Sequence, residues 1–363
     1  MKVRIATSRS LSAAERILIR GTNWIGDAVM TIPAVNAVRN AFPHAGISLL
    51  AKPWLAEVYR LCPSLDEIIL FHDPGAHSGI MGKLRLAEEL KERKFDAAIL
   101  LQNAIEAAII AWRAGIPIRA GYNSDGRGLL LTHSVQRTDA IRKVHQIEYY
   151  LEMVKALGCP SAGTDVRLTP GEAYHTLGDG VLRAHGIGGE GLLIGMAPGA
   201  TYGPAKRWFP ERFAAVADRL IDELSARVIV FGSKDDRESA DQVEQSARHP
   251  LTNLAGKTNL KEVIAVMARC SLFISNDSGL MHIAGALNIP TVAIFGSTNP
   301  VTTSPVGDRS VVIYKSASCS PCLKVTCPTD FRCMELISVD DVYEKSRRLL
   351  EEHILKNPPV SPF

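Results

Sequence analysis

The sequence predicts an α/β protein with two domains, each built around a parallel sheet. The chain has 363 residues, enough for two domains that each bury a core. Hydrophobic residues make up 46% and charged residues 22%, a balance typical of globular proteins that excludes a disordered or fibrous chain. Short apolar runs alternate with helical patterns, and this series starts again in the second half.

In the first half, four apolar runs predict buried strands at residues 17–20, 47–51, 67–71 and 97–101. Helical patterns separate them at residues 28–41, 53–61 and 83–94. Strands joined by helices of this length form right-handed βαβ units, so we expect the first sheet to be parallel.

In the second half, strands are expected at residues 192–197, 228–232, 272–275 and 291–296. Helices are expected at residues 209–224, 280–287 and 339–355. Residues 158–171 are rich in Gly, Pro and Ser and predict the boundary. The expected organisation is a domain at 1–165, a second at 166–338, and a C-terminal helix within 339–363 that packs across both.

Charge is uneven along the chain, with a net +5 over residues 1–168 and −2 over residues 169–363. A basic half suits an anionic partner, such as a phosphorylated substrate or a membrane surface. Lys and Arg form no dense stripe, so a nucleic acid partner is not expected. The sequence has neither an uncharged apolar run of about 18 residues nor an apolar signal region, which predicts a cytoplasmic protein.

The loop after the first strand has the glycine spacing of a phosphate-binding P-loop, at Gly21 and Gly26. Asp27 and Ala28 stand where that motif requires Lys and then Ser or Thr, so the motif is excluded. The dinucleotide pattern GxGxxG is also absent. Asp27 is either a first-turn carboxylate stabilised by the helix dipole or a general base.

Two loops of the second half carry candidate anion-binding residues. Gly199, Thr201 and Lys206 precede a helix and suit a phosphate site, with an incidental solvent-exposed lysine as the alternative. Asp277 and Ser278 are expected to cap the helix that follows. The amides of Ser278 and Gly279 would then face an anion, whereas His282 is either a ligand contact or a buried helix residue.

Four segments resemble those of the ADP-heptose–lipopolysaccharide heptosyltransferases: ILIRGTNWIGDAVMTIPAV, APGATYGPAKRWFPERF, NLAGKTNL and SNDSGLMHIAGALNIPTVAIFGSTNP. Two others, RAGYNSDGRGLLLTH and VHQIEYYL, are similar to type II members, and the resemblance runs from about residue 17 to residue 343. It implies a GT-B fold, with two Rossmann-like domains facing a cleft. It also implies inverting transfer of L-glycero-D-manno-heptose from ADP-heptose to the first heptose of heptosyl-Kdo-lipid A. The family works at the cytoplasmic face of the inner membrane and needs no cofactor.

The resemblance also implies residue roles. Asp27 would deprotonate the acceptor hydroxyl, and Lys206 would neutralise the leaving diphosphate. Asp277 would hold heptose hydroxyls. The other donor-binding positions are Gly199 and Thr201 for phosphate, Ser278, Gly279 and His282 around the diphosphate, Asp236 for ribose, and Leu254, Ala255, Gly256 and Thr258 for adenine. Candidates for the acceptor's carboxylates and phosphates are Arg119, Arg127, Arg137, Arg142 and Lys143.

Four clustered cysteines have the spacing C-x2-C-x4-C-x5-C, at Cys319, Cys322, Cys327 and Cys333. They are either reduced structural thiols or ligands of zinc or an iron–sulfur cluster. The spacing matches neither a ferredoxin nor a zinc ribbon, so no metal is assigned.

Three alternatives to a type II enzyme stay open. One is a heptosyltransferase I or another core heptosyltransferase. The second is a GT-B sugar-nucleotide epimerase or hydrolase, and the third is a nucleotide-sugar sensor. A sensor would need no base, so the presence of both Asp27 and Lys206 argues against it.

Overall fold

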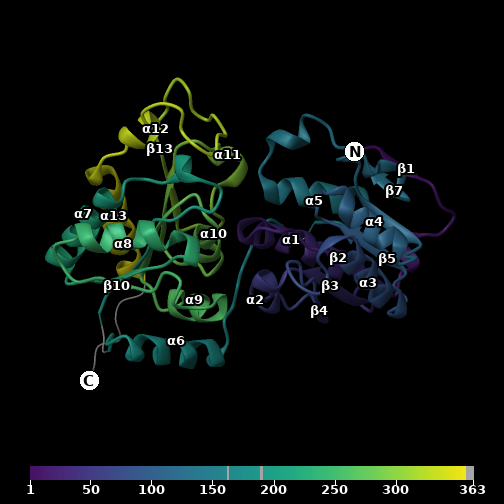
Figure 1. Ribbon diagram of the computed structural model, residues 1–363, viewed down its shortest axis with the longest axis horizontal. Coiled ribbons are helices and arrows are strands. Elements are labelled where there is room, and N and C mark those ends of the chain that lie inside the picture. The colour runs from purple at the N-terminus through teal and green to yellow at the C-terminus, as the bar shows by residue number, and fades with distance from the viewer. Residues whose placement is uncertain (162, 189–190, 357–363) are drawn as a thin grey trace. The chain divides into compact units, whose positions relative to one another are not determined.

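The computed structural model describes residues 1–161, 163–188 and 191–356. The chain divides into two compact units, Met1–Val166 and a second that starts at Arg167 (Figure 1). The division lies inside the segment 158–171. Residues 357–363 of the predicted C-terminal segment lie outside the described residues.

The first unit contains a seven-stranded sheet in the order β1-β7-β6-β5-β2-β3-β4. All neighbours are parallel except β1, which runs antiparallel to β7. The strands are Val3–Ile5 (β1), Arg16–Arg20 (β2), Gly46–Ala51 (β3), Glu67–Leu70 (β4), Ala97–Leu100 (β5), Ile118–Tyr122 (β6) and His133–Val135 (β7). Helices α1 (Ile25–Ala41) and α5 (Gln146–Ala156) pack together, as do α3 (Gly79–Glu92) and α4 (Ile105–Arg113). Helix α2 spans Ala56–Arg60.

The second unit contains a six-stranded parallel sheet in the order β10-β9-β8-β11-β12-β13. The strands are Leu193–Ala197 (β8), Arg227–Val230 (β9), Thr252–Asn253 (β10), Leu272–Asn276 (β11), Thr291–Phe295 (β12) and Ser310–Tyr314 (β13). The longer helices are Glu172–Ala184 (α6), Pro210–Leu224 (α7), Arg237–Ser246 (α8), Leu260–Met267 (α9), Gly279–Ala286 (α10) and Val339–Lys356 (α13). Two short helices complete it, Pro300–Thr303 (α11) and Arg332–Glu335 (α12).

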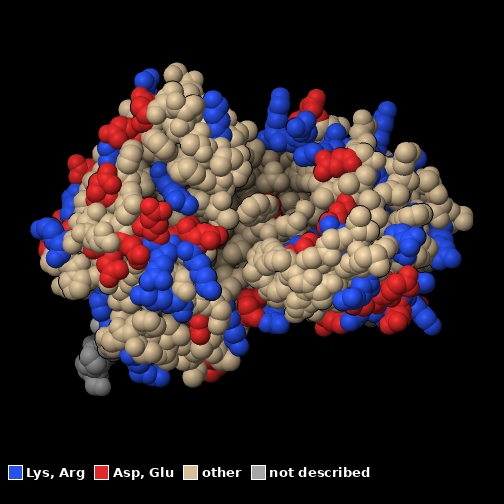
Figure 2. All heavy atoms as spheres, in the orientation of Figure 1, with Lys and Arg blue, Asp and Glu red and all other residues tan. Residues whose placement is uncertain are grey.

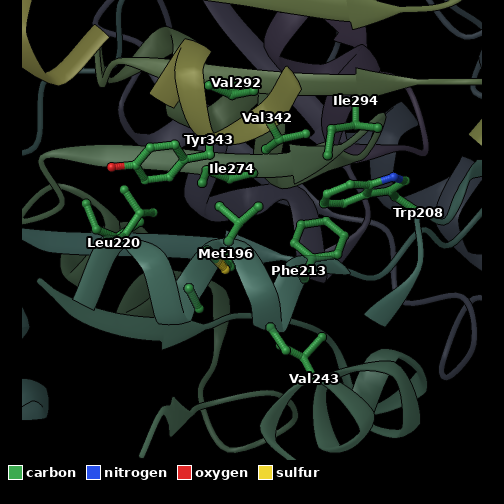
Figure 3. Close-up of a cluster of buried hydrophobic side chains, with 14 of the residues drawn as sticks. Met196, Trp208, Phe213, Leu220, Val243, Ile274, Val292, Ile294, Val342 and Tyr343 are labelled. Atoms are coloured by element: carbon green, nitrogen blue, oxygen red, sulfur yellow. The ribbon is translucent and has the colours of Figure 1, made fainter. Parts of the chain in front are cut away.

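A large core cluster of the second unit lies between its sheet and helices α7 and α13 (Figure 3). Ile274 and Val292 come from the strands and Phe213 from α7, while Val342 and Tyr343 come from α13. Burying such side chains contributes about 1.5–3 kcal/mol each. The final helix therefore completes the core of its own unit.

Apart from the antiparallel edge strand β1, the parallel strands of each sheet start in the middle and are added outward in two directions. In the first sheet, β2, β3 and β4 proceed to one side, and β5, β6 and β7 to the other. In the second, β8, β9 and β10 proceed one way, and β11, β12 and β13 the other. Ligands of open α/β sheets bind at the carboxyl ends of the strands where this direction switches. The loops after β2 and β5, and after β8 and β11, are therefore the expected binding positions.

Helices of the described residues are all too short or too polar to cross a bilayer.

Candidate active site

An ion pair occupies the switch point of the second sheet. Lys206 ends the short 3-10 helix Pro204–Lys206 after β8, and its Nζ lies 2.6 Å from Oδ2 of Asp277, which follows β11. Thr298, after β12, donates its hydroxyl to the same oxygen at 2.6 Å. The side chains of Lys206 and Asp277 are only 14% and 5% exposed. Three loops thus bring one cation and one carboxylate together at the predicted phosphate site.

Only one of the two predicted capping residues caps α10. Ser278 is the N-cap, and its Oγ accepts from the Met281 amide at 3.4 Å. Asp277 still continues the sheet, because its amide donates to the carbonyl of Ile294 at 3.1 Å. Its carboxylate consequently points to Lys206, and the expectation that Asp277 shares the cap is wrong.

Asn276, which the sequence analysis missed, holds the two ends of the Lys206 loop. Its Nδ2 donates to the carbonyl of Pro198 at 2.7 Å, and its Oδ1 accepts from the amide of Trp208 at 3.0 Å. The residue is fully buried, so both bonds are shielded from water. A polar residue at the end of an apolar strand was the available signal.

The cysteine-rich segment, residues 319–333, holds the Lys206 loop in place through hydrogen bonds that the backbone carbonyls of the segment accept. Tyr202 donates its hydroxyl to the carbonyl of Leu323 at 2.8 Å, and the Ala205 amide donates to the carbonyl of Val325 at 3.0 Å. Gly203 has φ +152°, and a Cβ added there would lie 2.4 Å from that Val325 oxygen. Only glycine fits this close approach.

Asp236 is a buried capping residue. Its Oδ2 accepts from the amide and hydroxyl of Ser233 at 3.0 and 2.7 Å. A Cβ added at Gly199 would lie 2.1 Å from its Oδ1, so glycine is required where the two loops touch. Within the described residues Oδ1 has no hydrogen-bond donor. One carboxylate oxygen is thus uncommitted at the position predicted for ribose binding, and that role stays a prediction.

The other predicted donor-binding residues lie on loops or helix starts at the same sheet edge. Gly256 has φ +69°, and its amide donates to the carbonyl of Gly232 at 3.0 Å, which ties the loop after β10 to the loop after β9. The residues Leu254, Ala255 and His282 are buried, Thr258, Ser278 and Gly279 are half-buried, and Thr201 is exposed. Thr258 donates to the carbonyl of Leu254 at 3.5 Å.

In the first unit, Asp27 lies in the first turn of α1, immediately after β2. It is half-buried and close to Tyr150 of α5. Burial, and then the negative charge of Asp27, raise the pKa of Tyr150 well above its usual range. Tyr150 therefore keeps its proton beside the candidate base. It belongs to the VHQIEYYL segment but was not predicted as a site residue.

Arg20 fixes the loop that carries Asp27. It is buried at the end of β2, and its Nη2 donates to Oδ1 of Asn23 at 2.9 Å. Its Nη1 donates to the carbonyls of Gly21 and Leu50. Burial lowers the pKa of Arg20 to about 10, so the guanidinium stays charged near neutral pH.

The arginines predicted to bind the acceptor differ in how exposed they are. Arg127 is fully buried and donates to the carbonyls of Tyr122 and Gln102 and to Oδ1 of Asn103. Burial lowers its pKa to about 10. A buried guanidinium with these partners is a structural group, so the prediction for Arg127 is wrong.

Arg119 is half-buried, and its guanidinium donates to the carbonyls of Leu130 and Ile116 at 2.7 and 2.6 Å. These hydrogen bonds give the Arg119 guanidinium a structural role within the first unit. Arg142 and Lys143 are exposed after β7, with Arg142 3.5 Å from Asp139. Arg137 stacks on Tyr149, with Cζ 5.5 Å from the ring centre. Arg142 and Lys143 are thus the accessible candidates.

All four clustered cysteines are free thiols, with Cys333 buried and Cys319 exposed. Burial, followed by the charges of the other three, raises the pKa of Cys333. Over the described ranges, no group of three or more His, Cys, Asp or Glu side chains is arranged to hold a metal.

Charged residues of both signs are interspersed on the visible face of each unit (Figure 2). Lys and Arg form no continuous stripe on that face.

Comparison with known proteins identifies the class. A sequence model described as glycosyltransferase family 9 (heptosyltransferase) matches residues 83–331. Lipopolysaccharide heptosyltransferase 2 of Escherichia coli K12 is 32% identical over 315 residues, covering 82% of this chain and 87% of that protein. Lipooligosaccharide heptosyltransferase 2 of Haemophilus influenzae is also 32% identical, covering 82% and 88%.

Two solved structures of the same class are similar to this chain over nearly its whole length. The E. coli ADP-heptose LPS heptosyltransferase II aligns with a TM-score of 0.79 at 27% identity, covering 93% of this chain and 99% of that one. A family 9 glycosyltransferase from Veillonella parvula aligns with a TM-score of 0.84 at 27% identity, covering 96% and 99%. The protein is thus a glycosyltransferase with the GT-B fold. It belongs to glycosyltransferase family 9, the heptosyltransferase family.

Proposed function

We propose that this glycosyltransferase moves L-glycero-D-manno-heptose from ADP-heptose onto the first heptose of heptosyl-Kdo-lipid A, with inversion at the anomeric carbon. The observation that carries the proposal is the Lys206–Asp277 pair, 2.6 Å apart at the switch point of the second sheet. The choice of acceptor is supported by 32% identity to heptosyltransferase 2 of E. coli, against 26% to heptosyltransferase 1 of Pseudomonas aeruginosa.

In this proposal the second unit binds the donor. Lys206 meets the diphosphate and stabilises the negative charge that grows as ADP departs. Asp277 and Asn276 hold that lysine at the switch point, and Asp277 also accepts hydrogen bonds from heptose hydroxyls. Because Lys206 supplies the positive charge, the transfer requires no metal or other cofactor.

The first unit supplies the base. The acceptor hydroxyl oxygen attacks the anomeric carbon as the bond from that carbon to the diphosphate breaks, and its proton passes to the Asp27 carboxylate. One displacement from the opposite side inverts the anomeric centre. Tyr150 remains protonated beside Asp27, so the aspartate is the group that takes the proton.

The first unit also binds the acceptor in this proposal, through Arg142 and Lys143. Both are exposed cations, and heptosyl-Kdo-lipid A carries carboxylates and phosphates that such cations pair with. Because lipid A is anchored in a bilayer, the enzyme works at the cytoplasmic face of the inner membrane.

The decisive experiment measures ADP release from ADP-heptose with no acceptor, with Kdo-lipid A, and with heptosyl-Kdo-lipid A. We expect release only with the heptosylated acceptor. Release with Kdo-lipid A would instead define a heptosyltransferase I, and release without acceptor a hydrolase. Donor binding without release under any condition would indicate a sensor.

A further inference from the structure

Exposed apolar side chains of the first unit gather at the carboxyl edge of its sheet. Trp24 follows β2, Trp54 follows β3, Ile80 and Met81 follow β4, and Ile105 follows β5. Ile80 and Met81 are 79% and 75% exposed, and Trp24 is 57% exposed. Single exposed apolar residues are ordinary, but five on four successive strand ends form a shared surface.

Helix α4 extends this surface. Ile105, Ile109 and Trp112 are exposed and lie on one side of the helix, because they are four and three residues apart. Helix α3 packs beside α4 (Figure 1), and an ion pair between Lys83 and Glu106 joins the second turn of α3 to the first turn of α4. We call the surface formed by Trp24, Trp54, Ile80, Met81, Ile105, Ile109 and Trp112 the apolar rim.

Cations border the apolar rim. Arg85 on α3 and Arg113 beside Trp112 are exposed. Arg142 and Lys143 follow β7 and are exposed at the same sheet edge. Tryptophan prefers the headgroup level of a bilayer, while lysine and arginine are drawn to anionic lipids. This combination of aromatic, aliphatic and cationic side chains complements an anionic membrane surface.

We propose that the apolar rim docks the first unit on a bilayer that bears anionic headgroups. Asp27 lies three residues after Trp24 on the same edge, so docking brings the proposed base to the depth of a lipid-anchored sugar. The choice of a glycolipid acceptor rests on the proposed function, whereas the docking itself rests on the exposed side chains.

The test is flotation of the full chain with vesicles of phosphatidylethanolamine and phosphatidylglycerol. Replacing both Ile80→Ser and Met81→Ser should lower the bound fraction about tenfold or more, because two large apolar contacts are lost. Ile5→Ser is the matched control, since Ile5 is 61% exposed on β1, outside the apolar rim. Equal binding by the double variant, or no vesicle binding by the parent chain, would overturn the proposal. The proposal would also fail if light scattering showed that the parent chain is a dimer and the double variant a monomer.

A second measurement separates docking from transfer. The double variant should keep the parent rate on a water-soluble, deacylated heptosyl-Kdo acceptor and lose rate on the same sugar anchored in vesicles. If the parent chain binds vesicles but releases no ADP with either acceptor, docking stands and the proposed function fails. If the variant loses equal rate on both acceptors, the residues serve the reaction itself and docking fails.

Discussion

At the scale of single residues, the Lys206–Asp277 pair makes the sharpest prediction. Lys206→Ala should lower kcat by about 100- to 1,000-fold, the usual cost of losing a group that stabilises developing charge. It should also destabilise the fold by about 3 kcal/mol, because a buried carboxylate is left with Thr298 but without its cation.

Kinetics and urea unfolding check both effects. Adding Asp277→Asn to Lys206→Ala should restore part of the stability and none of the activity. Lys261→Ala on α9 is the control and should change neither quantity. A Lys206→Ala enzyme with the parent kcat would exclude the proposed role.

Asp27→Asn keeps the size of the side chain but removes the base. We expect kcat to fall at least about 100-fold, within the range ascribed to general-base catalysis. Calorimetric ADP binding should not change, because the proposed donor site lies in the other unit. If turnover by Asp27→Asn were undiminished, the Asp27 carboxylate would stabilise the start of α1 through the helix dipole and would not act as the base.

Replacing Arg127 should lower the stability of the protein, whereas replacing Arg142 should weaken acceptor binding. Arg127→Met should cost about 3 kcal/mol in stability, since it leaves buried carbonyls unpaired. Arg142→Ala should leave the melting temperature unchanged and raise the acceptor KM. An altered acceptor KM for Arg127→Met at full stability would contradict the structural role.

At the scale of elements, activity depends on how the Lys206 loop is held. Gly203→Ala introduces a Cβ 2.4 Å from the Val325 oxygen, at a φ that disfavours side chains. We expect kcat to fall about tenfold or more as Lys206 shifts, since small misplacements of a catalytic group are costly. Gly180→Ala in α6 meets no atom within 4 Å and should leave kcat unchanged. A normal kcat for Gly203→Ala would show that the cysteine-rich segment does not position the loop.

The sequence predicted the elements that have strong local patterns. Strands β2, β3, β8 and β12, and helices α7 and α13, lie within a residue or two of their predicted limits. Strands β1, β7 and β10 have only two or three residues, so pairing with a neighbour defines them rather than an apolar run. Strand β6 contains Arg119 and Gly121, which obscure its pattern.

The sequence indicated that Lys206 and Asp277 lie on loops after strands, and the structure brings the two side chains within 2.6 Å of each other, while their roles stay predictions. The site was not predicted where it depends on distant partners. Asn276 bonds to Pro198 across 78 positions, which no local pattern records. The burial of Arg127 likewise arises from carbonyls of two other loops, and a lone arginine in a glycine-rich segment gives no sign of it.

At the scale of the whole molecule, each unit has its own sheet, and the described core clusters each lie within a single unit. A fragment of residues 167–363 should therefore unfold cooperatively and show a higher melting temperature when ADP is added. Residues 1–166 should fold without responding to ADP. Differential scanning calorimetry of both fragments checks this, and ADP stabilisation of the first fragment would contradict the assignment of the donor to the second.

Helix α13 contributes Val342, Tyr343 and Leu350 to the core of the second unit. On the ribosome, the first unit can fold as soon as its contiguous residues emerge. The second must wait until α13 is synthesised, about 10–40 s later at ~5–20 residues per second. During that interval the α7 side of the second sheet lacks its final cover, so nascent chains stalled before Tyr343 should be the ones that chaperones and proteases capture.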